Sequence, residues 1–136
     1  MRRILLDTNM YAAFERGDEE VVERLRLADE IALSATILGE LLAGFAAGRR
    51  EAANRDELAL FLDSPRVCVV GVDAATADWY ARVYTLLRRK GKPIPTNDLW
   101  IAASALQHGY LLASRDEHFA VIEGLATVSH PSELTP

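Results

Sequence analysis

Short apolar runs alternate with stretches of helical periodicity along this chain, and that alternation restricts its possible folds more than any other feature. Five runs are predicted to be strands: Ile4–Leu6, Ile31–Leu33, Val67–Val72, Tyr110–Ala113 and Ala126–Val128. Segments with apolar residues at three- and four-residue spacing separate most of them. Because parallel strands need long connections, usually helices, the pattern predicts an α/β fold. Its parallel sheet would have about five strands and helices on both faces.

The expected helices begin at polar capping residues and end at glycine or proline. Their predicted ranges are residues 8–17, 18–28, 35–47, 51–62, 73–91 and 98–108. The long helix after Asp73 carries one apolar stripe, made by Ala77, Tyr80, Ala81, Tyr84 and Leu87. No internal repeat, low-complexity tract or Gly/Ser linker divides the chain, so residues 1–136 are predicted to form a single domain.

The composition excludes several classes of protein. Half of the residues are hydrophobic and 26% are charged, so the chain is expected to fold. A single cysteine, Cys68, excludes a disulfide framework and a cysteine-based zinc site. The apolar run after Arg3 is too short for a secretory signal, and the uncharged stretch Ile31–Gly39 is far below the roughly 20 residues that span a bilayer. We therefore expect a cytoplasmic protein without a membrane partner.

Four carboxylates are predicted to converge at one edge of the sheet. Asp7 follows the first strand, Glu40 lies in the helix after the second strand, Asp98 opens a helix, and Asp116 follows the fourth strand. Ligand sites in open parallel sheets form beyond the carboxyl ends of the strands. Each residue also has an ordinary interpretation. Asp7 and Asp98, the latter with Asn97, are suitable helix caps, Glu40 suits a rim position bonded to water or an amide, and Asp116 suits a turn.

Taken together, the four carboxylates predict a metal centre. Like charges in one pocket raise each other's pKa unless a cation compensates, and no lysine or histidine obviously does so. The three histidines, His108, His118 and His130, are interpreted as surface residues rather than ligands. Hard carboxylate oxygens without thiolate or imidazole suit Mg²⁺ or Mn²⁺, ions that typically serve phosphoryl chemistry.

Four short motifs occur in a fixed order along the chain. They are Leu5-Leu6-Asp7-Thr8-Asn9, then Glu40 in an apolar helix, then Asn97-Asp98-Leu99-Trp100-Ile101-Ala102-Ala103, and finally Ser114-Arg115-Asp116-Glu117-His118-Phe119. This ordered set resembles the PIN-domain ribonucleases, in particular the VapC toxins of bacterial and archaeal toxin–antitoxin pairs. The resemblance runs from the first strand to the last. It implies a metal-dependent endoribonuclease in which Asp7, Glu40, Asp98 and Asp116 hold one or two Mg²⁺ or Mn²⁺ ions.

The resemblance also implies roles for neighbouring residues and for partner molecules. Asn9, Ser114 and Asn97 would orient the ligands, and Ser114 keeps the hydroxyl where the family more often has threonine. The implied reaction is in-line attack of an activated water on an RNA phosphodiester, which leaves a 5′-phosphate and a 3′-hydroxyl. The implied partners are the RNA substrate, a second copy of the chain in a homodimer, and a small VapB-like antitoxin that covers the site.

RNA binding would need a local basic patch, because the net charge of −5 argues against broad adhesion to nucleic acid. Candidate phosphate contacts are Arg88, Arg89, Lys90 and Lys92, just before Asp98, with Arg115 and Arg49-Arg50 as additions. The alternative interpretation is a solvated helix end whose cations complement the helix dipole.

Other functions remain open from the residues alone. A phospho-receiver signalling domain is also a doubly wound sheet with an acidic Mg²⁺ pocket, and Asp73 could serve as its phosphoacceptor. Such domains place an acidic pair after the first strand and a lysine after the last-but-one strand, where this chain has Asp7-Thr8-Asn9 and Ser114-Arg115. A haloacid-dehalogenase-like phosphatase would need an aspartate where Asn9 stands. A PIN-like scaffold that only binds RNA or protein is the remaining alternative.

Overall fold

The centre of the molecule is a parallel β-sheet, seen in a computed structural model that describes residues 2–128. Its five strands lie in the order β3-β2-β1-β4-β5, and each neighbouring pair is parallel. The strands are β1 (Arg3–Leu6), β2 (Glu30–Ser34), β3 (Val67–Val70), β4 (Leu111–Ala113) and β5 (Thr127–Val128). The predicted α/β class and parallel sheet are confirmed. His130 lies outside the described residues.

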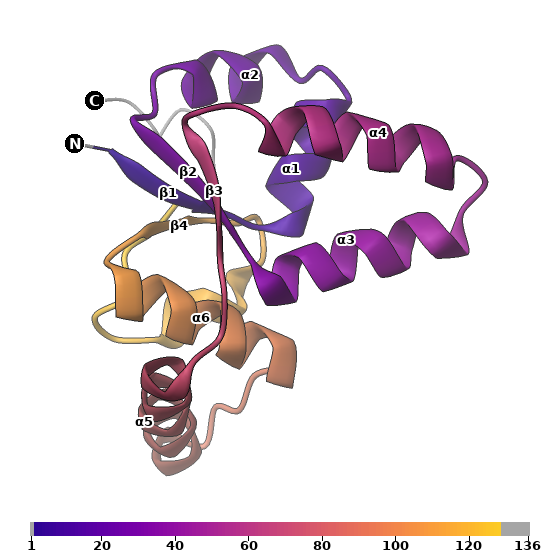
Figure 1. Ribbon diagram of the computed structural model, residues 1–136. Helices are drawn as coiled ribbons and strands as arrows, with labels where there is room; N and C mark the ends of the chain where they lie inside the picture. Colours follow the sequence, from indigo (N-terminus) through magenta and orange to yellow (C-terminus); the bar gives the residue numbers. More distant parts are fainter. Residues whose placement is uncertain (1, 129–136) are drawn as a thin grey trace.

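Helices connect the strands and cover both faces of the sheet. They are α1 (Thr8–Glu15), α2 (Glu19–Arg26), α3 (Ala35–Ala47), α4 (Glu51–Leu62), α5 (Ala74–Lys90) and α6 (Thr96–His108). In Figure 1, α1, α2 and α4 lie above the sheet and α5 and α6 lie below it, while α3 and α4 form a hairpin that extends to one side. A 3₁₀ helix over Glu117–Val121 follows β4, and the sequence pattern does not indicate it. Among residues 2–128, no helix has the length and apolarity needed to cross a bilayer.

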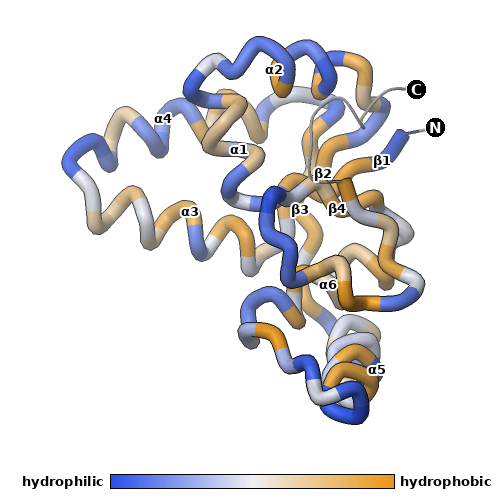
Figure 2. Tube along the Cα trace, turned by 180° about the vertical axis from the view of Figure 1, so that it is seen from behind, coloured by the Kyte–Doolittle hydropathy of each residue, from blue (hydrophilic) through white to orange (hydrophobic). Residues whose placement is uncertain are grey.

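The core is built around the central strand. Ile4, Leu5 and Leu6 are fully buried, and Leu5 lies opposite Ala32 of β2 and Leu112 of β4. Such a continuous apolar run is typical of a parallel strand that is covered on both faces. Figure 2 shows the same distribution, with hydrophobic residues on the strands and α6 and hydrophilic residues at most turns.

Side-chain caps explain why most helices begin where the sequence predicts. Asp18 accepts a hydrogen bond from the backbone N–H of Val21, and Ser34 accepts one from Ile37. Asp73 forms a capping box with Thr76 at the start of α5. At the other ends of α5 and α6, Gly91 and Gly109 adopt the left-handed conformation, with φ of 66° and 70°, that glycine accepts without a Cβ clash.

Two element boundaries differ from the sequence prediction. The predicted strand over 67–72 ends at Val70, because its one neighbour, β2, ends at Ser34, the residue opposite Val70. The last helix begins at Thr96 with Pro95 as its cap residue, and no side chain caps it. Asn97 and Asp98 therefore do not serve as the helix caps that the ordinary interpretation required.

The buried face of α5 also differs from the predicted apolar stripe. Thr76, Val83 and Leu87 are buried, whereas Tyr84 is 45% exposed. The physical reason is a polar contact, since the Thr76 hydroxyl donates to the side-chain oxygen of Gln107 on α6 at 2.5 Å and thereby fixes the rotation of α5. Of the five stripe residues, Leu87 alone is fully buried, and Ala77 and Ala81 are exposed.

Candidate active site

Asp7 lies directly after the central strand and is 5% exposed. One carboxylate oxygen accepts a hydrogen bond from the backbone N–H of Thr8 at 2.8 Å, and the other accepts one from the Ser114 hydroxyl at 2.5 Å. Burial raises the pKa of Asp7, whereas the two hydrogen bonds lower it. The negative charges of Glu40 and Asp98 also raise it, and the net result is a pKa above the ordinary value of an aspartate. Asp7 therefore shares its environment with two further carboxylates.

Glu40 is the one charged residue of α3, and it reaches the same edge of the sheet. Its carboxylate accepts hydrogen bonds from the Thr8 hydroxyl at 3.0 Å and from the Asn97 side-chain amide at 3.4 Å. The contact with Asn97 agrees with the ordinary interpretation of Glu40 as a rim residue bonded to an amide. That contact joins α1, α3 and α6 at the position where the sequence predicts a metal centre.

Asp98, Asp116 and His118 bring ligand atoms within 4.8 Å of one another. The Nδ1 atom of His118 lies 2.9 Å from a carboxylate oxygen of Asp98 and 2.9 Å from one of Asp116. Asp98 is 9% exposed, whereas the His118 side chain is half exposed. The hydrogen bond to Asp98 raises the pKa of His118, and the nearby charge of Asp116 adds to this effect.

The Ser114 hydroxyl connects the first strand to the loop after β4. It donates to Asp7, accepts from the backbone N–H of Asp116 at 3.0 Å, and lies 3.4 Å from the side-chain amide of Asn9. The oxygen of the same Asn9 side chain accepts from the backbone N–H of Arg115 at 3.0 Å. Asn9 and Ser114 therefore position the loop that carries Asp116.

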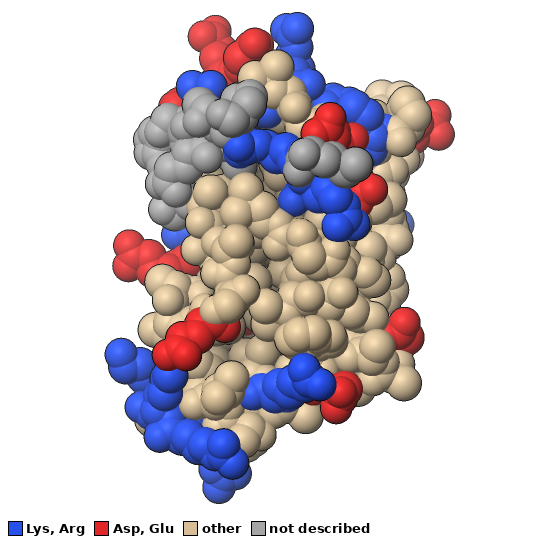
Figure 3. Space-filling model, turned by 90° about the vertical axis from the view of Figure 1, so that its left-hand side faces the viewer, with Lys and Arg blue, Asp and Glu red and all other residues tan. Residues whose placement is uncertain are grey.

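A basic cluster lies at the carboxyl end of α5, made by Arg88, Arg89, Lys90 and Lys92. Lys and Arg side chains gather at the lower end of the molecule in Figure 3, at the height of α5 in Figure 1. Lys90 pairs with Glu123 at 2.7 Å, and Arg88 donates to the Tyr84 hydroxyl at 3.4 Å. Three of the cations lie in the last helical turn, so they also complement the helix dipole.

The other candidate cations lie elsewhere. Arg115 stands between Ser114 and Asp116, and its guanidinium pairs with Asp18 at 3.4 Å. Arg50 precedes α4 and lies 3.8 Å from Glu57. Neither belongs to the basic cluster on α5.

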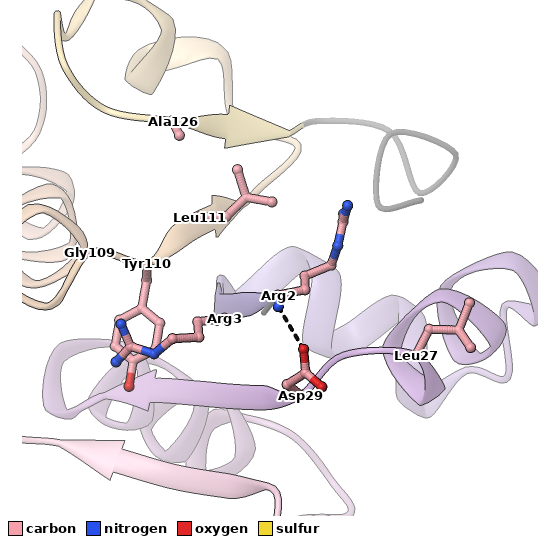
Figure 4. A pocket seen from close by; sticks show the side chains of 8 residues that line it. All are labelled: Arg2, Arg3, Leu27, Asp29, Gly109, Tyr110, Leu111 and Ala126. Atoms are coloured by element: carbon pink, nitrogen blue, oxygen red, sulfur yellow. Dashed lines mark hydrogen bonds between the residues drawn. The ribbon is translucent and has the colours of Figure 1, made fainter. Parts of the chain in front are cut away.

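A cavity of about 520 Å³ opens at the opposite end of the sheet, where the strands begin. In Figure 4, Arg3 lies against the ring of Tyr110, with 4.4 Å between the guanidinium carbon and the ring centroid. Arg3 also pairs with Glu30 at 3.2 Å, and the backbone N–H of Arg2 donates to Asp29. None of the four predicted ligands lines this cavity, so the candidate site is at the carboxyl edge.

The contact of His118 with two carboxylates is the feature that sequence reasoning missed. Its predicted surface position agrees with the exposed ring, but the prediction did not place it among the carboxylates. The available signal was local: Asp116 caps the 3₁₀ helix by accepting from the backbone N–H of His118, and this turn brings the imidazole back toward the carboxylate.

The chain is similar to a known protein family over most of its length. The family model described as PIN domain matches residues 4–125. The chain is similar to Ribonuclease VapC4 of Mycobacterium tuberculosis, with 31% identity over 134 residues that cover 95% of this chain and 98% of that protein.

Solved structures are also similar to the chain. The crystal structure of VapBC2 from Rickettsia felis bound to a DNA fragment from their promoter matches with a TM-score of 0.84 and 27% identity, over 92% of this chain and 96% of the other. The structure of VapBC-5 from Mycobacterium tuberculosis, described as a member of the VapBC family of toxin-antitoxin systems, matches with a TM-score of 0.69 and 27% identity, over 94% and 97%.

Proposed function

Because the family model and a full-length relative both match, the chain belongs to the PIN-domain family, and we propose that it is an endoribonuclease of the VapC type, the toxin of a toxin–antitoxin pair. The phospho-receiver alternative is not favoured. Its candidate phosphoacceptor, Asp73, caps α5 and is bonded to Thr76 and to the Gln107 amide at 3.0 Å. The scaffold without catalysis is not favoured either, because all four carboxylates lie at one edge of the sheet.

The observation that supports this function most strongly is the convergence of carboxylates from four separate parts of the chain. Asp7, Glu40, Asp98 and Asp116 come from the ends of β1 and β4 and from two different helices. Burial raises the pKa of Asp7, and the negative charges of Glu40 and Asp98 raise it further, so the ionised form of this carboxyl is disfavoured without a nearby cation. Such an arrangement costs stability unless a ligand of positive charge is bound.

A divalent metal ion fits this set of donors. Carboxylate oxygens are the preferred ligands of Mg²⁺ and Mn²⁺, and the imidazole of His118 is also acceptable to Mn²⁺. We propose that Asp7, Glu40, Asp98 and Asp116 hold the ion. When bound, such an ion lowers the pKa of water and stabilises negative charge on phosphate oxygens during RNA hydrolysis.

The remaining side chains would prepare the site and hold the RNA. Ser114 and Thr8 fix the carboxylates of Asp7 and Glu40 by hydrogen bonds, so these ligands need little reordering. His118, when protonated, offsets the charge of Asp98 and Asp116 in the absence of a metal ion. The basic cluster on α5 would contact phosphates of the substrate, since such contacts supply most of the affinity for nucleic acid.

We also propose the partners of this enzyme. An acidic pocket suits a cationic group of an inhibitor, and an arginine from a VapB-like antitoxin would pair with these carboxylates. A homodimer and a cytoplasmic location, where RNA is available, complete the proposal.

The test is cleavage of total cellular RNA by the purified chain, free of any antitoxin, with Mg²⁺, Mn²⁺ or EDTA. Asp98→Asn keeps the shape of the side chain but removes a ligand charge, so cutting should stop in the variant and in EDTA. Circular dichroism would verify that the variant is folded. Cleavage by folded Asp98→Asn at the wild-type rate would contradict the proposed site, and failure of the wild type with every metal ion would contradict the function.

A further inference from the structure

A second cavity lies beside the candidate active site and has no role in the function proposed so far. Its volume is about 310 Å³, and it opens between the carboxyl half of α5 and the segment that leads into α6. The residues that line it are Tyr84, Leu87, Arg88, Pro93, Ile94 and Leu99. Five of these six residues are apolar or aromatic, and the sixth is a cation.

The side chains of this cavity are arranged as a floor and a wall. Leu87 and Leu99 are buried and form the floor, whereas Tyr84 is 45% exposed and forms part of the wall. The hydrogen bond from Arg88 to the Tyr84 hydroxyl holds the phenol in place. The cavity therefore combines an aromatic ring, which also stacks on Tyr80 with 6.3 Å between the centroids, with an apolar base and one positive charge.

The position of the cavity connects it to the carboxylates. Leu99 directly follows Asp98 in the first turn of α6, and Ile94 directly precedes the cap residue Pro95. The floor of the cavity and one predicted metal ligand thus belong to the same helical turn.

The charge around the cavity indicates which kind of molecule enters it. Arg88 lines the cavity, and Lys92 directly precedes its lining residue Pro93, so two cations of the basic cluster lie at its edge. Within residues 2–128, Lys92 has no ion-pair partner. A second copy of the chain docked here by two-fold symmetry would bring two such clusters together, which is unfavourable. A polyanion that carries flat apolar groups matches both the positive charge and the aromatic, apolar lining of the cavity.

We propose that this cavity is a base-binding subsite, in which one unstacked nucleobase of single-stranded RNA packs against Tyr84 while the basic cluster contacts the flanking phosphates. The inference rests on the proposed ribonuclease function and adds a source of substrate selection next to the reacting phosphodiester. Base stacking on aromatic side chains is tolerant of sequence, so the subsite would favour accessible single-stranded positions over duplex RNA.

The experiment measures binding by fluorescence anisotropy, with the full chain in EDTA so that no cleavage occurs. The probes are a short single-stranded RNA and an abasic strand of the same length and charge. The variant is Tyr84→Ala, and the matched control is Leu86→Ala, which removes an apolar side chain that is 47% exposed on the same helix but does not line the cavity. Thermal melting verifies that both variants are folded.

The subsite predicts that Tyr84→Ala weakens binding of the RNA about tenfold, leaves binding of the abasic strand unchanged, and keeps the salt dependence of the wild type. Leu86→Ala should bind both strands as the wild type does. Equal binding of RNA by Tyr84→Ala and wild type would overturn the proposal. So would an equal loss for both strands, or a change in oligomeric state without a change in RNA affinity. Cleavage by the wild type with Mn²⁺ is measured separately, so failure of the ribonuclease function is distinguishable from failure of the subsite.

Discussion

The two ends of the β-sheet place charged residues in opposite ways. Where the strands begin, Arg3 pairs with Glu30, and Glu30 also accepts a 2.5 Å hydrogen bond from Tyr110 that, with Arg3, lowers the pKa of the glutamate. Where the strands end, the pKa of Asp7 is raised by burial and by neighbouring carboxylates. The charges where the strands begin therefore stabilise the fold, whereas the like charges where the strands end destabilise it. This contrast is the one expected if the carboxyl end binds a cationic ligand, as proposed above.

The sharpest test of this contrast replaces one glutamate by glutamine at each end of the sheet. The first substitution is Glu40→Gln, at the end where the strands finish. The amide oxygen can still accept from the Thr8 hydroxyl, but the ligand charge is lost. We expect RNA cleavage to fall by about 100-fold or more. In EDTA the free energy of unfolding should equal or exceed that of the wild type, because one charge that raises the pKa of Asp7 is removed. A clear loss of stability in urea denaturation would contradict the comparison.

The counterpart at the other end is Glu30→Gln, for which we expect the reverse outcome. The substitution weakens the contacts with Arg3 and Tyr110, which are partly exposed. The free energy of unfolding should fall by about 1–2 kcal/mol, the range for a charge-assisted hydrogen bond at such a position. Cleavage per folded molecule should stay at the wild-type value. Loss of cleavage without loss of stability would contradict the assignment of stability to one end of the sheet and of cleavage to the other.

The smallest effect is a pH dependence of stability that differs between the two ends. The pKa of Glu30 is lowered in the folded chain, so its stabilisation is present above the ordinary value of 4.5 and is lost as the pH falls further. The pKa of Asp7 is raised above 3.8, so its destabilising charge is relieved as the pH falls through that raised value. Urea denaturation of wild type and Glu30→Gln in EDTA should therefore give a difference that is constant above pH 5 and shrinks below it. A difference that grows in acid would contradict the sign given for Glu30.

The sequence was sufficient for the fold because its signals are local. Asp18, Ser34 and Asp73 cap helices through contacts within three residues, and glycines end α5 and α6 where predicted. The rotation of α5 was not predictable, because it depends on a hydrogen bond between Thr76 and Gln107, 31 residues apart. Apolar periodicity indicates which faces of a helix can be buried, but it does not predict a polar contact with another helix that selects one of them.

The sequence was sufficient to predict which carboxylates form the candidate site, but not which contacts connect them to other side chains. Parallel topology places Asp7 and the start of the helix that carries Glu40 at one edge of the sheet. Asp98 opens α6, which follows α5 and not a strand, so its position also depends on how these two helices pack. The contact of His118 with Asp98 depends on the 3₁₀ turn after β4, for which the sequence carries no strong signal. The roles of Asn97 and the basic cluster remain predictions, since the contacts of Asn97 and of Lys90 are also compatible with purely structural tasks.

The short central strand has a consequence for accuracy in folding. Arg3 begins β1 and Asp7 directly follows it, so one strand of four residues carries a charge for each end of the sheet. A shift of β1 by one residue against its neighbours would turn its buried side chains to the wrong face. It would also move Arg3 away from Glu30 and Asp7 away from Ser114 in the same step. A misaligned chain would therefore lose its stabilising pair and its proposed metal ligand together, so mispaired molecules with nuclease activity are not expected to accumulate.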